Sequence, residues 1–490
     1  MIPLIYIYDL AFLVLFTLFV VIFLYKKRKN LKKDGIMYLY RTKIGIRLIN
    51  YFGGKYKKTI TVFSILAVIS GYILMITALY LFLYEFVYVY LFNPSIVRAI
   101  KVPPIFPLVP YLPELFQIKF LKPFYFTYWI VAIAVIAVFH EFAHGIVARR
   151  YGIKIKTTGF GFLGPFLAAF VEPDEKQMKK KPKFQQISVL AAGTFTNLIL
   201  AGIFFLLLVL FFSLTYVPSG ASFNIYTPNL INTTAITVIG GVNANNLNNT
   251  ELLNFINTKK IDNNFVSASG EKLNLTTLKV DNSTYYIGIS NLKEQLKAES
   301  GLIYLYEDLP AVKSGLKGAI VKIDNNKIST YSDLSVVMSK YSPGDKIKLE
   351  TKSEGKTYVY DITLAQDSQN KTRAVIGIGY LSNSRSGFLG KIYNLLNMYQ
   401  KPGTYYEPRF NADLVLFIYN LIWWLALINL SVALVNMIPM GIFDGGAMFM
   451  LTVWGITGNK RYAEIAFKFV TYLLLAALLV VMVAWAVAVF

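Results

Sequence analysis

The sequence predicts a polytopic α-helical membrane protein with about six transmembrane helices and a β-rich extracytoplasmic insert between the fourth and fifth spans. Hydrophobic residues make up 55% of the 490 residues and aromatic residues 16%, a composition typical of integral membrane proteins. Apolar runs long enough to cross a bilayer recur along the chain. Residues 218–410 differ in kind, because they are rich in asparagine and charge and read as short alternating strands and turns.

Basic residues beside the apolar runs predict how the chain crosses the membrane. The spans are expected at roughly residues 4–25, 60–92, 124–147, 187–217, 413–437 and 464–489. Lysine and arginine gather after the first and third spans and before the last, and such loops are cytoplasmic. We therefore expect a multi-pass protein of the cell membrane with both termini outside. The formal charge of +22 reflects these loops rather than nucleic-acid binding.

The N-terminal region, residues 1–123, contains the first two spans. The first span lacks a preceding basic stretch and runs into a cluster of positive charges, which favours a membrane anchor over a signal peptide. After the second span, proline interrupts any continuous helix, and an external loop at the membrane surface is expected. The prolines are Pro94, Pro103, Pro104, Pro107, Pro110, Pro113 and Pro123.

Residues 124–217 form the first part of a membrane core, with two spans joined by a cytoplasmic stretch. Within that stretch, residues 151–172 are apolar and glycine-rich but too broken for a span. A hairpin dipping toward the membrane is expected, which is tolerated where it lines a cavity inside the protein.

The insert is predicted to hold two modules, residues 218–299 and 300–385, because short sequence patterns recur within it. The segment Ala235–Ile239 resembles Ala319–Ile323. Each is followed by an acidic residue and a leucine, at 251–252 and at 333–334. The second module, with Pro310–Gly318 before a strand, resembles a PDZ domain, a fold that binds peptide ends by strand addition. The first module is PDZ-like through the repeat alone. A linker at 386–412 is expected to lead back to the membrane.

The two histidines of the chain, His140 and His144, flank Glu141 in the pattern H-E-x-x-H within the third span. Residues four apart share a helix face, so both imidazoles can bind one metal ion. Glu141 then lies where a carboxylate can take a proton from a metal-bound water. An ionisable residue inside a span is costly and indicates function. The alternative is a pair of core histidines satisfied by hydrogen bonds.

The rest of the metal site must use oxygen, because the chain contains no cysteine and both histidines are already assigned. Asp444 stands out at the cytoplasmic end of the fifth span, at the same membrane depth as the histidines. Pro439 and the paired glycines after Asp444 would break the helix and let the carboxylate turn inward. Its alternative role is a loop aspartate that caps the next helix. Residues 413–455 are thus the second part of the membrane core, and 456–490 the C-terminal transmembrane helix.

Together these motifs resemble the site-2 protease family of intramembrane zinc metalloproteases. The resemblance rests on the H-E-x-x-H motif, on Asn436-x-x-Pro439 followed by Asp444-Gly445, and on the stretch 191–197. It implies that one zinc ion is bound by His140, His144 and Asp444, and that Glu141 is the general base. It also implies that Asn197 and Asn436 hold substrate or stabilise the reaction intermediate.

The expected function is therefore hydrolysis of peptide bonds in transmembrane segments of membrane-anchored, regulatory proteins, near the cytoplasmic side. Transmembrane protein substrates, the lipid bilayer and peptide ends at the PDZ-like modules are the expected partners. One alternative is a membrane-tethered, PDZ-type peptide-binding receptor with a non-catalytic metal site. Another is a transporter, but repeated spans with broken helices in both halves, which transporters usually show, are not visible in the sequence.

Overall fold

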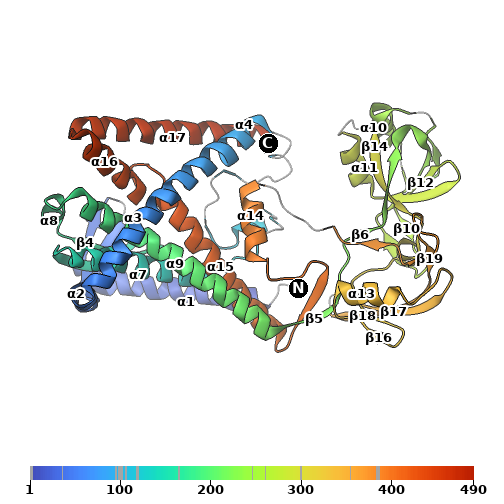
Figure 1. Cartoon of the computed structure of the whole chain (residues 1–490), viewed down its shortest axis with the longest axis horizontal. Helices are drawn as coiled ribbons and strands as arrows, with labels where there is room; N and C mark the ends of the chain where they lie inside the picture. Colours follow the sequence, from blue (N-terminus) through green and yellow to red (C-terminus); the bar gives the residue numbers. More distant parts are fainter. Residues whose placement is uncertain are drawn as a thin grey trace. The chain divides into compact units, whose positions relative to one another are not determined.

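The chain folds as two compact units, which the computed structural model of Figure 1 shows. The membrane unit contains Met1–Leu214, Ser386–Leu396 and Asp413–Phe490, and the insert unit contains Thr215–Arg385 and Asn397–Ala412. The structure describes residues 4–489 apart from 36, 94–96, 98–102, 105–107, 117, 119–120, 164–165, 246, 260, 298–300, 354 and 382–386.

Six helices within the described ranges are long and apolar enough to cross a membrane. They are α1 (Leu4–Lys27), the composite helix of α3 (Lys57–Tyr80), η2 (Leu81–Tyr88) and α4 (Val89–Phe92), α7 (Phe126–Arg150), α9 (Lys183–Thr215), α15 (Ala412–Asn436) and α17 (Lys460–Val489). In the composite helix, η2 is a π-helical segment. The six predicted spans are confirmed as apolar helices. In the proline-rich loop, a short helix α6 (Leu112–Leu115) forms, and Pro94 and Pro107 lie outside the described residues.

A four-stranded antiparallel sheet accompanies these helices in the membrane unit. Its order is β1 (Leu31–Asp34), β2 (Met37–Thr42), β3 (Ile155–Leu163) and β4 (Phe166–Pro173). The hairpin expected at 151–172 is β3–β4. Strands β1 and β2, which were not expected from the sequence, come from the first basic loop. Strand β1 pairs with β2, and β2 pairs with β3, with Tyr40 opposite Phe160. The sheet therefore joins two loops distant in sequence and leaves β4 at one edge.

Shorter helices complete the membrane unit. They are η1 (Arg28–Asn30), α2 (Ile46–Lys55), α8 (Glu175–Lys179), α14 (Gly387–Leu396) and α16 (Asp444–Thr457). Helix α2 packs against the C-terminal half of α7, where Gly145 gives room for Ile49. Helices α16 and α17 lie side by side (Figure 1).

Within the described residues, the insert unit contains two six-stranded sheets and three small two-stranded sheets. The first large sheet has the order β7 (Pro228–Asn232), β14 (Leu302–Glu307), β13 (Ser283–Ile287), β12 (Thr276–Val280), β8 (Ile236–Ile239) and β9 (Val242–Asn243). The second has the order β18 (Lys356–Thr363), β17 (Lys346–Ser353), β15 (Ala319–Ile323), β5 (Tyr216–Ala221) and β22 (Thr404–Pro408), with β16 (Asn326–Lys327) beside β15. The small sheets pair β10 (Phe265–Val266) with β11 (Lys272–Leu273), β19 (Ala365–Gln366) with β20 (Ala374–Val375), and β21 (Ile378–Gly379) with β6 (Ile225–Tyr226).

The repeat noticed in the sequence corresponds to equivalent elements of the two large sheets. Strands β8 and β15 are each followed by a helix, α10 (Asn249–Thr258) and α13 (Tyr331–Met338). The repeated acidic residues, Glu251 and Asp333, are the third residues of these helices and close capping boxes with Asn248 and Thr330. The repeated acidic residue therefore reflects helix capping. In each box the N-cap side chain accepts from the backbone N–H of the acidic residue, and the acidic side chain accepts from the backbone N–H of the N-cap residue. The remaining helices are η3 (Thr233–Ala235), α11 (Ile289–Leu296) and α12 (Pro310–Ser314).

The sheets do not respect the expected module boundaries. Strand β14, expected at the start of the second module, pairs with β7 and β13 in the first sheet, and β5, expected near the first module, pairs with β15 in the second. The expected linker 386–412 also carries structure, namely α14 and β22, and β22 pairs with β5. Strand pairing between distant segments fixes these boundaries, and local sequence patterns do not report it.

Candidate metal centre

The H-E-x-x-H motif lies on α7, an apolar helix that ends at Arg150 before a left-handed Gly152. Its helical spacing places the two imidazoles on one face, with His140 Nε2 and His144 Nε2 3.0 Å apart. His140 is buried, with 8% of its surface exposed. The motif therefore presents two neighbouring nitrogen atoms inside the membrane unit.

Asp444 reaches the same point from α16, where it is the first helical residue. Its Oδ2 lies 3.4 Å from Nε2 of His140 and 3.4 Å from Nε2 of His144. The turn between α15 and α16 is tight, because a Cβ on Gly445 or Gly446 would overlap the backbone of Met437 or Met440. The paired glycines thus let the chain fold back closely enough to bring this carboxylate to the histidines.

The spacing of these three atoms suits a zinc ion. Zinc takes nitrogen and oxygen ligands at about 2.0–2.2 Å, so neighbouring ligands in a tetrahedron lie roughly 3.3–3.6 Å apart. Two of the three observed separations are 3.4 Å and the third is 3.0 Å. Helix α9 also leaves space here, because a Cβ on Gly193 would lie 2.5 Å from His144 Nε2 and 2.6 Å from His140 Nε2. The residues present therefore fit the metal that the sequence predicts.

Contacts behind the imidazoles orient the two rings. His144 Nδ1 lies 2.6 Å from the carbonyl oxygen of Val189. Since a carbonyl only accepts, Nδ1 carries a proton, and in the neutral imidazole the lone pair is then on Nε2. His140 Nδ1 lies 3.0 Å from Nδ2 of Asn197. Asn197 is fully buried. It therefore contacts the side of His140 that faces away from the proposed ion.

Glu141 lies beside the histidines, and one of its carboxylate oxygens and one ring nitrogen from each of His140 and His144 all lie within 4.8 Å of one another. Its Oε2 accepts a hydrogen bond from the backbone N–H of Val171 in β4, at 3.0 Å. The β3–β4 hairpin thus holds the carboxylate next to the two histidines.

A cleft of about 370 Å³ opens onto this centre. Its walls are mainly apolar and come from α7, β4 and α15, and His140, Glu141 and Asn436 are its polar lining. Asn436 is the last residue of α15. Asn197 is absent from the lining residues of this cleft. The two asparagines that the sequence grouped together therefore occupy different places, one on the cleft and one behind His140.

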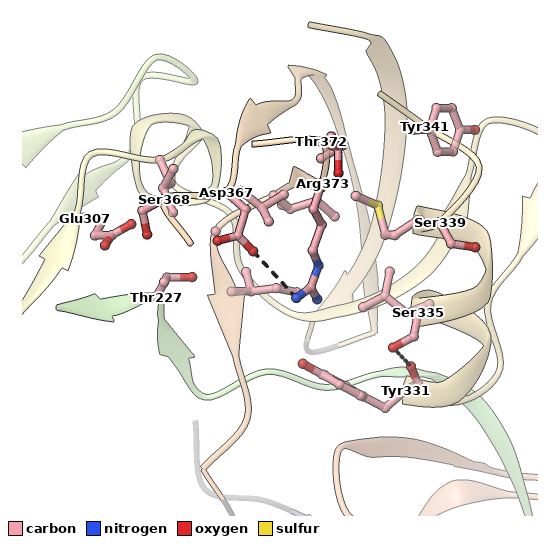
Figure 2. Close-up of a pocket in the computed structure, with 18 residues that line it drawn as sticks. Thr227, Glu307, Tyr331, Ser335, Ser339, Tyr341, Asp367, Ser368, Thr372 and Arg373 are labelled. Carbon is pink, nitrogen blue, oxygen red and sulfur yellow. Dashed lines mark hydrogen bonds and ion pairs between the residues drawn. The ribbon is translucent and has the colours of Figure 1, made fainter. Parts of the chain in front are cut away.

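A second cavity, of about 510 Å³, lies in the insert unit between α13 and the segment 374–378 (Figure 2). Leu334, Ile376 and Ile378 supply apolar lining. In Figure 2 the side chain of Arg373 points toward Asp367, and the two groups are 3.6 Å apart. Burial, followed by the negative charge of Asp367, raises the pKa of Glu307 at the same cavity.

Sequence reasoning named the side chains around the centre but missed the groups that support them. Gly193 is part of the stretch 191–197 that carries the resemblance, but its spacing role was not expected, and neither were the contacts of the Val189 carbonyl and the Val171 N–H. Backbone groups leave no mark on residue type, so the last two had no sequence signal. Gly193 had one, as a glycine within a long apolar helix, where it is unfavourable unless close packing requires it.

Comparison with known proteins gives two findings. The family model described as peptidase family M50 matches residues 128–481. An uncharacterized protein of Methanocaldococcus jannaschii is 28% identical over 196 residues, which are 38% of this chain and 47% of that protein. The chain thus spans about half the length of this curated relative.

Proposed function

This chain belongs to peptidase family M50, the site-2 protease family of membrane metalloproteases, and from that premise we propose that it cuts peptide bonds within transmembrane segments of membrane-anchored proteins. The observation that carries the proposal is the convergence of His140, His144 and Asp444 at a cleft lined by Glu141. We expect regulatory proteins as substrates and cleavage near the cytoplasmic side.

In this proposal His140, His144 and Asp444 hold one zinc ion. When bound, zinc lowers the pKa of a coordinated water toward 7 and polarises a carbonyl group. Glu141 takes the proton from the attacking water and returns it to the leaving amine nitrogen, which is general base and then general acid catalysis. The hydrogen bond from Val171 N–H holds the Glu141 carboxylate in position for both transfers.

The cleft walls favour an unwound substrate segment. A helix cannot be cut while its carbonyl groups are bonded internally, so the substrate must expose its backbone. Strand β4 is at the edge of its sheet, and Leu167–Ala169 line the cleft. An extended segment can pair with such an edge. Asn436, at the same cleft, is placed to donate its amide N–H to substrate backbone or to the oxyanion of the intermediate.

The test compares wild-type protein with Glu141→Gln on a single-span reporter whose apolar segment contains a helix-breaking Asn-Pro pair. We expect wild type to release fragments whose masses place the cut inside the apolar segment. Loss of the general base should slow cleavage at least about 10²-fold, while zinc content stays unchanged. Equal cleavage by both proteins would refute the proposed mechanism. Stoichiometric zinc with no cleavage by wild type would favour the peptide-binding receptor instead.

We also propose that the cavity of the insert unit binds an extended peptide from the substrate. A helix and a strand segment form its walls, and apolar residues lie between them. A PDZ domain binds a peptide by strand addition in a groove of this kind. Two roles follow from this position in the chain. The insert either selects a trimmed substrate end or excludes substrates with bulky external domains.

Replacing residues 222–385 with a short flexible linker separates these two roles. A receptor predicts that the short reporter is no longer cleaved, because the contact that recruits it is gone. A size filter predicts that the short reporter is still cleaved and that a reporter with a folded external domain becomes a new substrate. Fragment yields for both reporters are the measurement. Unchanged cleavage of both would contradict any role of the insert in substrate selection.

A further inference from the structure

Asn197 contacts one of the proposed metal ligands and is not among the residues that line the cleft. It is fully buried on α9, and its amide contacts His140 Nδ1 at 3.0 Å. It does not line the cleft, which Asn436 does. A role that touches substrate is therefore a poor description of this residue, and a role that acts through His140 fits its position.

This contact matters because it involves Nδ1, the ring nitrogen of His140 that must carry the proton when Nε2 binds a metal. A neutral imidazole has one N–H and one lone pair, and a metal needs the lone pair on Nε2. The proton must then be on Nδ1, which needs an acceptor. The atom opposite is one end of the Asn197 amide, whose oxygen and nitrogen exchange places by a half-turn of the group.

The form of His140 that binds a metal determines which end of the amide must face its ring. With Nδ2 toward His140, the buried Oδ1 has no hydrogen-bond partner among the described residues. With Oδ1 toward His140, the oxygen accepts the Nδ1–H bond and Nε2 is free to bind metal. The same logic operates at His144, where the Val189 carbonyl accepts from Nδ1.

We propose that Asn197 is a positioning residue that accepts a hydrogen bond from His140 Nδ1 through Oδ1 and so fixes the imidazole for metal binding. The proposal rests on the proposed metal site. Groups that orient a metal-bound histidine in this way typically change metal affinity by about 10–100-fold when removed. A substrate-binding role, by contrast, would leave metal affinity unchanged.

Two substitutions test whether the side chain at position 197 must accept a hydrogen bond from His140. Asn197→Asp keeps the shape and only accepts, so its zinc affinity should equal or exceed that of wild type. Asn197→Leu can do neither, and its zinc affinity should fall by about 10–100-fold. Asn429→Leu is the matched control, because Asn429 is equally buried, bonds the Leu425 carbonyl and is not on the cleft. Its zinc affinity should match wild type.

Zinc affinity is measured on the purified full chain by competition with a chromophoric chelator, and the visible spectrum of Co²⁺-loaded protein reports ligand geometry. Wild-type affinity in Asn197→Leu, or a loss in Asn197→Asp equal to that in Asn197→Leu, would overturn the inference. The aspartate variant keeps the test decisive if the leucine variant does not fold. Failure of wild type itself to bind zinc would instead refute the proposed metal site.

Discussion

At the scale of single residues, Gly193 shows how closely α9 approaches the centre. The added Cβ of any other residue would stand 2.5–2.6 Å from both histidine Nε2 atoms, inside the distance at which carbon and nitrogen repel. The absence of a side chain is what leaves room there. A glycine in a helix interior costs about 1 kcal/mol relative to alanine, and the space needed beside the two histidines is a sufficient reason for its presence.

This leads to a prediction about alanine at two glycines of α9. Gly193→Ala should lower zinc affinity at least about tenfold, which corresponds to only about 1.4 kcal/mol, because the methyl group displaces the ligands. Gly202→Ala is the control, since its Cβ would meet no atom within 4 Å. Zinc content after dialysis against a chelator is the measurement. Equal retention of zinc by both variants would contradict the role given to Gly193.

At the scale of elements, Asp9 joins α1 to the start of α7. Helix α7 has no side-chain cap of its own at Tyr125. Instead, the buried Asp9 carboxylate accepts from Phe126 N at 2.7 Å, from Thr127 N at 2.9 Å and from Thr127 Oγ1 at 2.6 Å, and Tyr111 also donates to it. Free N–H groups at a helix start need acceptors. A neighbouring span therefore caps the helix that carries the histidines.

The corresponding prediction concerns stability. Asp9→Ala should destabilise the protein by about 1–3 kcal/mol for each buried donor left without a partner, and Asp9→Asn, which keeps one acceptor oxygen, should lose less. Asp413→Ala removes the same charge from an exposed position and should change stability by less than about 0.5 kcal/mol. Thermal unfolding midpoints in detergent provide the comparison. A midpoint for Asp9→Ala that matches Asp413→Ala would show that the cap does not matter.

At the scale of the whole molecule, the membrane unit and the insert unit differ in composition and are joined by strands at both ends of the insert. The basic loops predict that the insert lies outside and the β1–β2 and β3–β4 loops inside. Because the chain has no cysteine, each introduced cysteine is the single thiol of the protein, and the proposed topology can be tested one position at a time.

A membrane-impermeant maleimide applied to intact cells should label Lys356→Cys, which is exposed in the insert unit, and should not label Lys29→Cys or Lys180→Cys. After the membrane is permeabilised, all three should react. These positions are exposed in the structure, so lack of labelling reports the membrane barrier and not burial. Labelling of Lys29→Cys or Lys180→Cys in intact cells would reverse the orientation proposed for the active site.

The sequence by itself determined the six apolar helices and the identity of the three side chains, His140, His144 and Asp444, that meet in the membrane unit. These conclusions rest on local signals: hydropathy over a span, two histidines one helical turn apart, and a chain without thiols in which a carboxylate had to complete the set.

Only the tertiary structure decided which distant groups meet. It paired β2, and through it β1, with the β3–β4 hairpin. It exchanged β5 and β14 between the expected modules, and it placed Asn197 behind His140 rather than on the cleft. Strand pairing and side-chain facing depend on contacts between segments far apart in the chain, and residue type alone does not encode those contacts.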